Sequence, residues 1–167
     1  MVAAGATERR AQRLEPLEQR IWQALRDVAD PEIPVLSIVE LGIVRHVREE
    51  RDGRVHVGLT PTYSACPATE VILQAVRARL DEQGLREVVV DPVLSPPWSS
   101  EWLSDEGRRK LEVFGIAAPR ASEASRISCP RCASSAVERV SEFGSTPCKA
   151  HYRCGACLEP FDVFKCL

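Results

Sequence analysis

Two pairs of closely spaced cysteines are the part of the sequence with the clearest chemistry. Cys129 and Cys132 form the first Cys-x-x-Cys pair, Cys154 and Cys157 form the second, and 21 residues separate the pairs. A tetrahedral Zn²⁺ ion takes four thiolates at about 2.3 Å, and two tight turns can each deliver two of them. The spacing therefore predicts one structural metal site, with zinc or iron bound, whose four sulfurs leave no open position for a substrate.

Two further cysteines lie near these pairs without an obvious place in a four-sulfur site. Cys148 falls in the unusual stretch Phe143-Gly-Ser-Thr-Pro-Cys-Lys149, and Cys166 follows further along. Either can replace one of the four ligands or remain a free thiol. Ala133 stands directly after the first pair, where zinc knuckles usually have glycine, so we expect a slightly strained turn at that position.

Cys66 is the candidate for a reactive thiol. It lies where a loop enters a predicted helix, with Pro67 in the first helical position. The free N–H groups and partial positive charge of a helix N-terminus favour thiolate, so we expect the pKa of Cys66 to lie below about 8.5. A thiolate binds soft metals or attacks electrophiles. The alternative is that Cys66 is a small buried side chain that fills a turn.

Asp30 and Glu32 are candidate partners of this thiol. They lie in the stiff loop Asp30-Pro-Glu-Ile-Pro34. Their carboxylates can bind a hard metal or form hydrogen bonds beside Cys66. In the alternative interpretation, Asp30 only ends the preceding helix and Glu32 is solvated, because a residue before proline disfavours the helical region.

Two tryptophans, Trp98 and Trp102, lie four residues apart after a pair of prolines. They either cap the hydrophobic core beneath a loop or form a surface for a partner, since tryptophan is enriched in binding interfaces.

The hydrophobic pattern predicts an α+β scaffold for these residues. Helices are expected from Pro16 to about Asp30, from Pro67 to Gly84 and over 105–114, with strands over 38–47, 54–59 and 88–90. The order α-β-β-α-β-α is typical of a small sandwich in which helices pack on a short sheet. We therefore expect a disordered tail over 1–14, a first domain over 15–115, a linker over 116–125 and a zinc ribbon over 126–167.

Composition and charge argue against several classes of protein. The 167 residues include no run of about 18 apolar residues, and residues 1–13 lack the apolar region of a secretory signal. Seven cysteines without such a signal indicate metal and thiol chemistry in a reducing cytoplasm. The net charge is −2, and residues 126–167 carry only six basic against four acidic side chains, so no nucleic-acid partner is expected.

Several stretches resemble a known family. Asp30-Pro-Glu-Ile-Pro34, Leu59-Thr-Pro-Thr-Tyr-Ser-Ala-Cys-Pro67 and Asp91-Pro-Val-Leu-Ser-Pro-Pro-Trp98 are similar to motifs of the SufT-like iron–sulfur assembly factors. With the cysteine-rich region, the chain from about residue 15 resembles the PaaD (or PaaJ) family, which is encoded with phenylacetyl-CoA epoxidase. The resemblance implies a SufT-like fold, with Cys66 as the family's reactive cysteine and Asp30 and Glu32 in its acidic loop.

The resemblance also implies a role in aerobic phenylacetate degradation. That role would be maturation, in which iron or an iron–sulfur cluster is delivered to the reductase or the di-iron subunit of the epoxidase, a monooxygenase. The sequence has no Glu-x-x-His motif of the kind that di-iron oxygenases carry, so no catalytic activity of its own is expected. The alternative is a non-catalytic structural or electron-relay subunit. Exposed sheet edges of a small α+β domain would allow a homodimer.

Overall fold

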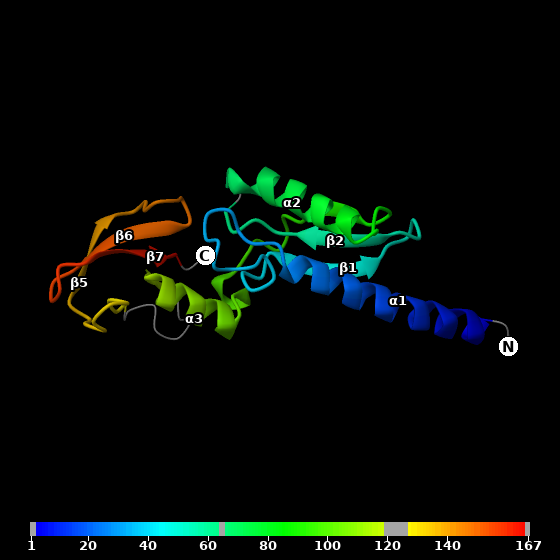
Figure 1. Ribbon diagram of the computed structural model, residues 1–167, viewed down its shortest axis with the longest axis horizontal. Coiled ribbons are helices and arrows are strands. Elements are labelled where there is room, and N and C mark those ends of the chain that lie inside the picture. The colour runs from blue at the N-terminus through cyan, green and yellow to red at the C-terminus, as the bar shows by residue number, and fades with distance from the viewer. Residues whose placement is uncertain (1–2, 64–65, 119–126, 166–167) are drawn as a thin grey trace.

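The molecule has two sheets, which lie toward opposite ends of its long axis (Figure 1). The computed structural model describes residues 3–63, 66–118 and 127–165, with backbone alone for 3–13. In chain order the elements are α1 (Ala3–Arg26), β1 (Val44–Glu49), β2 (Val55–Leu59), α2 (Ala68–Glu82), β3 (Val89–Pro92), a 3-10 turn (Ser100–Trp102), α3 (Asp105–Phe114), β4 (Ile116–Ala117), β5 (Val137–Ser141), β6 (Lys149–Cys154) and β7 (Pro160–Phe164). The predicted α-β-β-α-β-α order of the first unit is confirmed.

The first sheet has three strands in the order β1-β2-β3. β1 and β2 form an antiparallel hairpin with Val47 opposite Val57, and β3 pairs in parallel with β2. A parallel pair needs a crossover connection, which α2 supplies. Alternation along β2 places Val55, Val57 and Leu59 in the core, as predicted. Helices α1 and α2 contact each other, α1 contacts β1 and α2 contacts β3.

Local signals in the sequence determine where α2 and α3 begin and end. Pro67 directly precedes α2, and Gly84 follows it with φ +71°. Ser104 caps α3, because its Oγ accepts a hydrogen bond from the N–H of Gly107 at 2.9 Å, and Gly115 ends the helix with φ +92°. Glycine adopts such left-handed angles without strain, so both helix ends follow from the sequence.

Helix α1 is longer than the sequence pattern predicts. It begins at Ala3 and contains Pro16, so residues 3–14 continue the helix where a disordered tail was expected. A proline inside a helix removes one backbone hydrogen bond. The flanking residues are mainly alanine, arginine, glutamine and glutamate, whose high helix propensity offsets part of that loss.

The segment before β1 is a turn rather than a strand. The N–H of Glu40 donates to Ser37 Oγ at 3.1 Å, and the N–H of Ser37 donates to Glu40 Oε2 at 2.9 Å. This reciprocal pair closes a turn in the manner of a capping box. Gly42 follows with φ +70°, and a Cβ there would lie 2.5 Å from the carbonyl oxygen of Trp102. The strand predicted over 38–47 therefore begins only at Val44.

The second sheet, which we call the ribbon, has the order β4-β7-β6-β5. β5, β6 and β7 pair antiparallel, whereas β4 pairs in parallel with Asp162 and Val163 of β7. The first residues of the predicted 116–125 linker are thus a strand, and residues 119–126 lie outside the described part. Successive side chains of a strand point to opposite faces. Ile116 accordingly joins the main core, and Ala117 joins a smaller core inside the ribbon.

The two units share the main hydrophobic core. Phe164 on β7 is 1 % exposed and Cys148 is 4 % exposed, and both pack among buried residues of the first unit. The ring of Phe164 contacts Trp98 with centroids 5.7 Å apart, and the Trp98 indole N–H donates to the carbonyl oxygen of Leu41 at 2.9 Å. Trp98 therefore caps the core, in line with one of its two interpretations, and joins the ribbon to the first unit.

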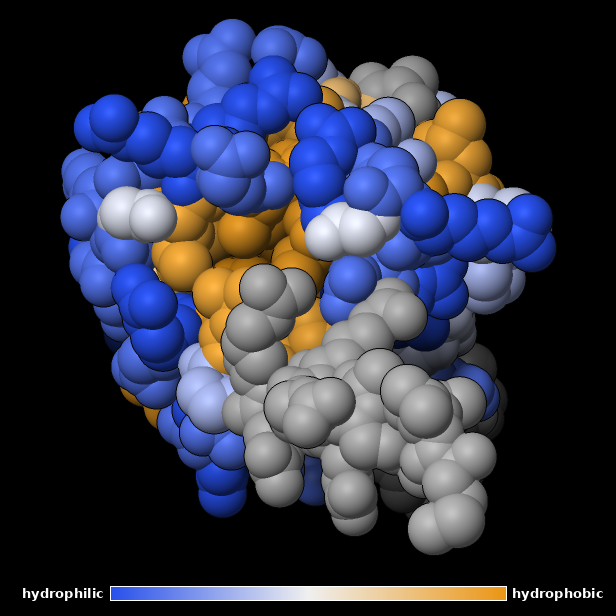
Figure 2. Space-filling model, turned by 90° about the vertical axis from the view of Figure 1, so that its right-hand side faces the viewer, coloured by the Kyte–Doolittle hydropathy of each residue, from blue (hydrophilic) through white to orange (hydrophobic). Residues whose placement is uncertain are grey.

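Figure 2 shows the end of the molecule at which α1 begins. Polar side chains cover most of this face, and apolar side chains are exposed together in one hollow near its centre. None of the helices in the described part of the chain combines the length and the apolar character that a bilayer crossing needs.

Candidate metal and thiol sites

The cysteines of the two Cys-x-x-Cys pairs converge in the ribbon. Their sulfur atoms lie within 4.8 Å of one another, and the residues are Cys129, Cys132, Cys154 and Cys157. The Cys129–Cys157 and Cys132–Cys154 sulfur pairs are 3.7 and 3.6 Å apart. A tetrahedron with metal–sulfur bonds of about 2.3 Å has edges of about 3.8 Å. The four sulfurs therefore fit a tetrahedral Zn²⁺ ion, which would tie the two turns of the ribbon together.

Each Cys-x-x-Cys turn is followed by a residue in the left-handed conformation. Ala133 has φ +59° and Leu158 has φ +65°. The N–H of Ala133 donates to the carbonyl oxygen of Cys129 at 2.8 Å, and that of Leu158 donates to Cys154 at 3.0 Å. A left-handed residue with a Cβ costs roughly 1–2 kcal/mol. The strain expected at Ala133 is confirmed, and Leu158 adds a second strained turn.

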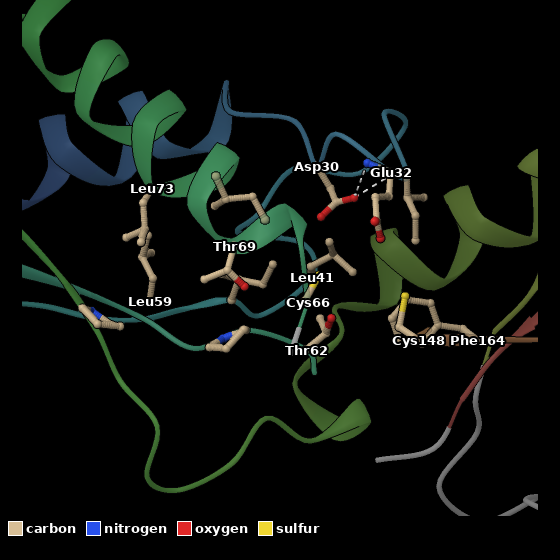
Figure 3. Close-up of a pocket in the computed structure, with 15 residues that line it drawn as sticks. Asp30, Glu32, Leu41, Leu59, Thr62, Cys66, Thr69, Leu73, Cys148 and Phe164 are labelled. Atoms are coloured by element: carbon tan, nitrogen blue, oxygen red, sulfur yellow. Dashed lines mark hydrogen bonds between the residues drawn. The ribbon is translucent and has the colours of Figure 1, made fainter. Parts of the chain in front are cut away.

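A second group of candidate residues lines a pocket between the two units (Figure 3). Asp30, Glu32 and Cys66 line it from the first unit, and Cys148 and Phe164 line it from the ribbon. Apolar side chains form most of its remaining wall, and its volume is about 20 Å³. A volume of this size admits about one water-sized guest. The fold thus brings together residues of three separate sequence motifs, namely the 30–34 loop, the 59–67 loop and the 143–149 stretch.

Cys66 lies two residues before the start of α2, and the backbone N–H groups of Ala68 and Thr69 donate to its sulfur. Burial nevertheless raises the pKa of Cys66, and the negative charges of Glu32 and Asp30 raise it further. The prediction of a thiol pKa below about 8.5 is therefore wrong, because burial outweighs the helix end. The sequence indicates the start of the helix and the acidic loop as a candidate neighbour, whereas it does not reveal the burial of the thiol.

Asp30 has a structural role in its own loop as well as a place at the pocket. It is 7 % exposed, and its Oδ1 accepts hydrogen bonds from the N–H groups of Glu32 and Ile33 at 2.9 and 2.8 Å. Burial raises the pKa of Asp30, although these two bonds oppose the shift. Burial, followed by the charge of Asp30, raises the pKa of Glu32. Figure 3 shows both side chains at the same end of the pocket as the two cysteines.

Cys148 lies outside the four-sulfur cluster. Its sulfur is 3.1 Å from the Thr146 hydroxyl. Burial raises the pKa of Cys148, the Thr146 contact opposes this, and the charges of Glu32 and Cys66 add to the increase. The proposal that it substitutes for a ribbon ligand has no support in this geometry, and Cys166, the other proposed substitute, lies outside the described residues.

The loop that carries Cys148 is fixed on β7. The hydroxyl of Ser145 donates to Asp162 Oδ2 at 2.7 Å, and a Cβ at Gly144 would lie 2.6 Å from Asp162 Oδ1. The N–H of Lys165 donates to the carbonyl oxygen of Cys148 at 2.9 Å. These contacts explain the Gly-Ser pair in the unusual 143–149 stretch, because the glycine lets the loop approach Asp162 and the serine binds it.

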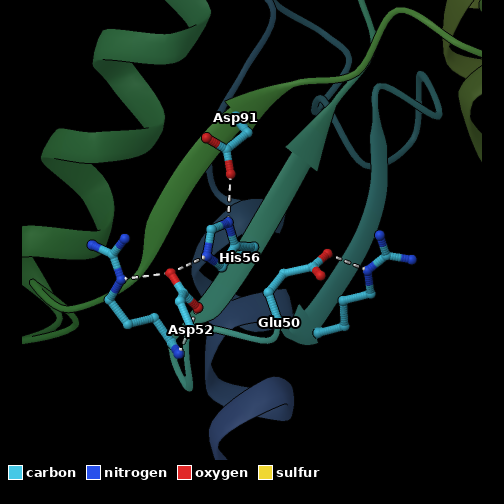
Figure 4. Close-up of polar contacts among 6 residues, drawn as sticks. Glu50, Asp52, His56 and Asp91 are labelled. Carbon is cyan, nitrogen blue, oxygen red and sulfur yellow. Dashed lines mark hydrogen bonds and ion pairs between the residues drawn. The ribbon is translucent and has the colours of Figure 1, made fainter.

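A polar cluster joins the hairpin to β3, and no motif in the sequence indicates it. His56 lies between two carboxylates, with Nδ1 2.5 Å from Asp91 Oδ2 and Nε2 3.1 Å from Asp52 Oδ2 (Figure 4). Hydrogen bonding to Asp91 and then Asp52 raises the pKa of His56. The alternating pattern of the sequence predicts that His56 lies on the polar face of β2. Its contact with Asp91 could not be predicted in this way, because it depends on the register between β2 and β3. None of the three lines the pocket beside Cys66.

Trp102 is half-buried and is covered by a side chain of the same molecule. The guanidinium of Arg45 lies 3.2 Å from the centre of its indole ring. This cation–π contact occupies one face of the ring, and Trp98 is buried. The two tryptophans therefore form no continuous exposed surface of the kind that the partner interpretation requires.

The fold and the sites together define a two-unit protein, in which a small α+β unit with a thiol pocket joins a four-cysteine ribbon. Residues 18–91 match the family described as "Iron-sulfur cluster assembly protein", and residues 117–165 match the "PaaD zinc beta ribbon domain". The chain is 45% identical over 157 residues to an Escherichia coli protein named as one subunit of a "Putative 1,2-phenylacetyl-CoA epoxidase", and the match covers 91% of this chain and 94% of the relative. The chain belongs to the PaaD family.

Other relatives match the first unit alone. A "Fe-S protein maturation auxiliary factor" of Porphyromonas gingivalis is 36% identical over 95 residues, covering 56% of this chain and 90% of the relative. The solved structure of a DUF59 domain of unknown function from Bacillus anthracis superposes with a TM-score of 0.54 at 30% identity, covering 59% of this chain and 94% of that chain. The SufT-like fold inferred from the sequence is confirmed for this unit.

Proposed function

We propose that this chain is an accessory factor that delivers iron or an iron–sulfur cluster to phenylacetyl-CoA epoxidase during its maturation. The observation that carries the proposal is the pocket in which Cys66, Asp30 and Glu32 meet. The unit that contributes Cys66, Asp30 and Glu32 to the pocket is related to an Fe–S maturation factor, and the whole chain is related to a protein whose name places it in a phenylacetyl-CoA epoxidase. In this proposal Cys66 is the metal-carrying thiol and the two carboxylates are further donors beside it.

The electrostatics of the pocket suit a cation. Burial raises the pKa of Cys66, Asp30 and Glu32, and the negative charges of the carboxylates add to the increase at Glu32 and Cys66. A divalent cation stabilises the thiolate and carboxylate forms that burial disfavours. Without a cation, a thiol with a raised pKa stays protonated and is a poor nucleophile. The pocket therefore favours metal binding over attack on an electrophile.

The ribbon has a structural role in this proposal. We assign the four thiolates of Cys129, Cys132, Cys154 and Cys157 to one zinc ion, which leaves no open coordination position. Zinc binding contributes on the order of 10 kcal/mol to the folding of such small units. The working molecule would comprise the first domain over 15–115 and the ribbon, act in the cytoplasm, and meet the reductase or the di-iron subunit of the epoxidase.

A complementation experiment tests this proposal. Cells that lack the gene receive the wild-type chain, Cys66→Ala, or the control Tyr63→Phe, which alters a residue 40 % exposed in the same loop. We expect epoxidase from the Cys66→Ala cells to be depleted in iron and inactive, and epoxidase from the control cells to be normal. Full iron content and activity with Cys66→Ala would overturn the proposal.

A second candidate function is a non-catalytic structural or electron-relay subunit of the assembled epoxidase. The observation that favours it is the name of the Escherichia coli relative, which describes a subunit. The two functions differ in when the chain is needed. Steady-state oxidation of phenylacetyl-CoA by mature epoxidase, measured with and without this chain, separates them. Full turnover without the chain supports maturation, and a strict requirement in every assay supports the second function.

A further inference from the structure

We propose that metal occupancy of the four-cysteine site controls access to Cys66, because the ribbon can wall the Cys66 pocket only while its two turns are held together. With the four-cysteine site filled, the ribbon closes the pocket. With that site empty, the wall is lost and the first unit presents Cys66 to other molecules. The inference rests on the proposed function, since it concerns the thiol to which that function assigns the cargo, and it adds a means of regulating that thiol.

The hairpin of β6 and β7 connects the two sites. Cys154 ends β6 and Cys157 lies in the turn that follows, so this turn supplies two of the four sulfurs. At the open end of the hairpin, Lys149 pairs with Phe164. Cys148 directly precedes β6, and both Cys148 and Phe164 line the pocket. One hairpin therefore carries metal ligands at its turn and the pocket wall at its open end, which lies toward the first unit (Figure 1).

Contacts at this open end hold the pocket wall in place. The N–H of Lys165 donates to the carbonyl oxygen of Cys148 at 2.9 Å, and the ammonium of Lys165 donates to the carbonyl oxygen of Pro147 at 2.9 Å. Phe164 packs against Trp98 of the first unit, with ring centroids 5.7 Å apart. Cys148 and Phe164 therefore keep their places in the main core only while β6 and β7 remain paired.

The ribbon depends on its metal because its own core is small. The described residues buried in that core are Ala117, Cys129, Cys154, Phe161 and Val163, and two of these are metal ligands. Both Cys-x-x-Cys turns are also followed by a strained residue with positive φ. A unit of this size usually needs a metal or a disulfide in order to fold. Metal removal should therefore unfold the ribbon and separate β6 from β7.

The first unit should remain folded when this happens. The Porphyromonas gingivalis factor and the Bacillus anthracis domain match this unit over 90% and 94% of their own lengths, so related chains consist almost wholly of it. Most of the pocket wall also belongs to the first unit. The closed pocket of about 20 Å³ has room for about one water-sized guest, and removal of Cys148 and Phe164 enlarges it. Loss of the ribbon therefore uncovers Cys66 without unfolding its surroundings.

The four-cysteine site can be reached from solvent. Cys132 and Cys157 are exposed, whereas Cys129 and Cys154 are buried. A competing chelator can therefore approach the metal through its two exposed ligands, so occupancy can change while the rest of the chain stays folded.

Alkylation of Cys66 measures its access directly. The full chain is treated with N-ethylmaleimide, either in excess zinc or with a chelator, and mass spectrometry follows the peptide that contains Cys66. We expect the rate to rise about tenfold or more without zinc, while circular dichroism still reports the helices of the first unit. Cys154→Ser should react at the fast rate in both buffers, which controls for the chelator. An equal rate for the wild-type chain in both buffers would overturn the inference.

The coupling must also act in the reverse direction, because linked binding equilibria are reciprocal. Trp98 belongs to the first unit and is not a metal ligand, but its contact with Phe164 stabilises the docked ribbon. Loss of such an aromatic pair corresponds to about a two- to tenfold change in affinity. Trp98→Ala should therefore weaken zinc binding by about this factor or more, as competition with a chromophoric chelator can measure. Trp102→Ala is the matched control, because Arg45 of the same unit covers the ring of Trp102, and it should keep wild-type zinc affinity.

A second variant decides the matter if Trp98→Ala does not fold. Phe164→Leu keeps an apolar side chain in the core and loses the aromatic pair, so the same decrease in zinc affinity is expected. Wild-type zinc affinity in the folded variants would show that the ribbon binds metal independently of its contact with the first unit, and the coupling would then be wrong.

The outcomes distinguish this inference from the proposed function. If access to Cys66 follows zinc occupancy but Cys66→Ala cells make fully active epoxidase, the coupling stands and the delivery role fails. If Cys66→Ala cells make epoxidase without iron but zinc removal leaves access to Cys66 unchanged, the delivery role stands and the coupling fails.

Discussion

The contact between Phe164 and Trp98 predicts a large effect for a single substitution in the ribbon. Phe164 is 1 % exposed and lies in the core that the two units share. Removing a buried phenylalanine side chain costs about 3–5 kcal/mol, of which the aromatic pair with Trp98 accounts for about 0.5–1.5 kcal/mol. We therefore expect Phe164→Ala to lower the free energy of unfolding by at least about 3 kcal/mol.

The ribbon offers a matched control for this substitution. Phe143 is 60 % exposed, and its ring lies 4.2 Å from the ammonium of Lys165. Its removal forfeits one exposed cation–π contact, so Phe143→Ala should cost less than about 1 kcal/mol. Urea unfolding of both variants in zinc-containing buffer gives the two values on the same scale.

A second measurement asks whether the lost contact opens the pocket. Cys148 is 4 % exposed beside Phe164, so a thiol reagent should modify it faster in Phe164→Ala under native conditions, as mass spectrometry of the labelled peptide can show. In Phe143→Ala the rate should match the wild-type chain. Equal unfolding free energies for the two variants, together with unchanged labelling of Cys148, would refute the shared core.

Three further predictions concern the rest of the chain. Ala133→Gly and Leu158→Gly should each stabilise the ribbon by about 1 kcal/mol in urea unfolding, because both residues have positive φ; a loss of stability would show that these angles carry no strain. Cys154→Ser should lower zinc content and unfold the ribbon while far-ultraviolet circular dichroism still reports the helices of the first unit; full zinc occupancy would contradict the four-sulfur site. The raised pKa of His56 stabilises the fold fully below the unfolded value of about 6.5, and this contribution is lost as the pH rises through the folded value. His56→Gln should therefore lose most stability at low pH, and a uniform loss across pH would contradict this sign.

The parts of the fold that the sequence predicts depend on short-range signals. The two Cys-x-x-Cys pairs, the Ser104 cap and the Gly115 helix end each act over a few residues, and the structure contains all of them as expected. The Ser37–Glu40 pair is also a short-range signal, but the apolar residues around it favour a strand when only the sequence pattern is considered.

The parts that the sequence did not predict depend on contacts between distant segments. The raised pKa of Cys66 follows from burial at the pocket, which the start of the helix alone does not reveal. Cys148 reaches the pocket only because β7 packs against the first unit, so no spacing rule could have placed it beside Cys66. Strand β4 is two residues long, which is too short for a pattern of alternating hydrophobicity.

The pairing of β4 with β7 has a consequence for synthesis on the ribosome. β4 is the first strand of the ribbon in sequence and β7 is the last. Ile116 can therefore pair with Asp162 only after Asp162 has left the ribosome. The segment that joins them contains β5 and β6, and bringing its ends together is entropically costly until contacts within the ribbon form. Phe164, which walls the pocket, follows two residues later. The nascent first unit therefore presents Cys66 in an unfinished pocket, and the completed ribbon closes it.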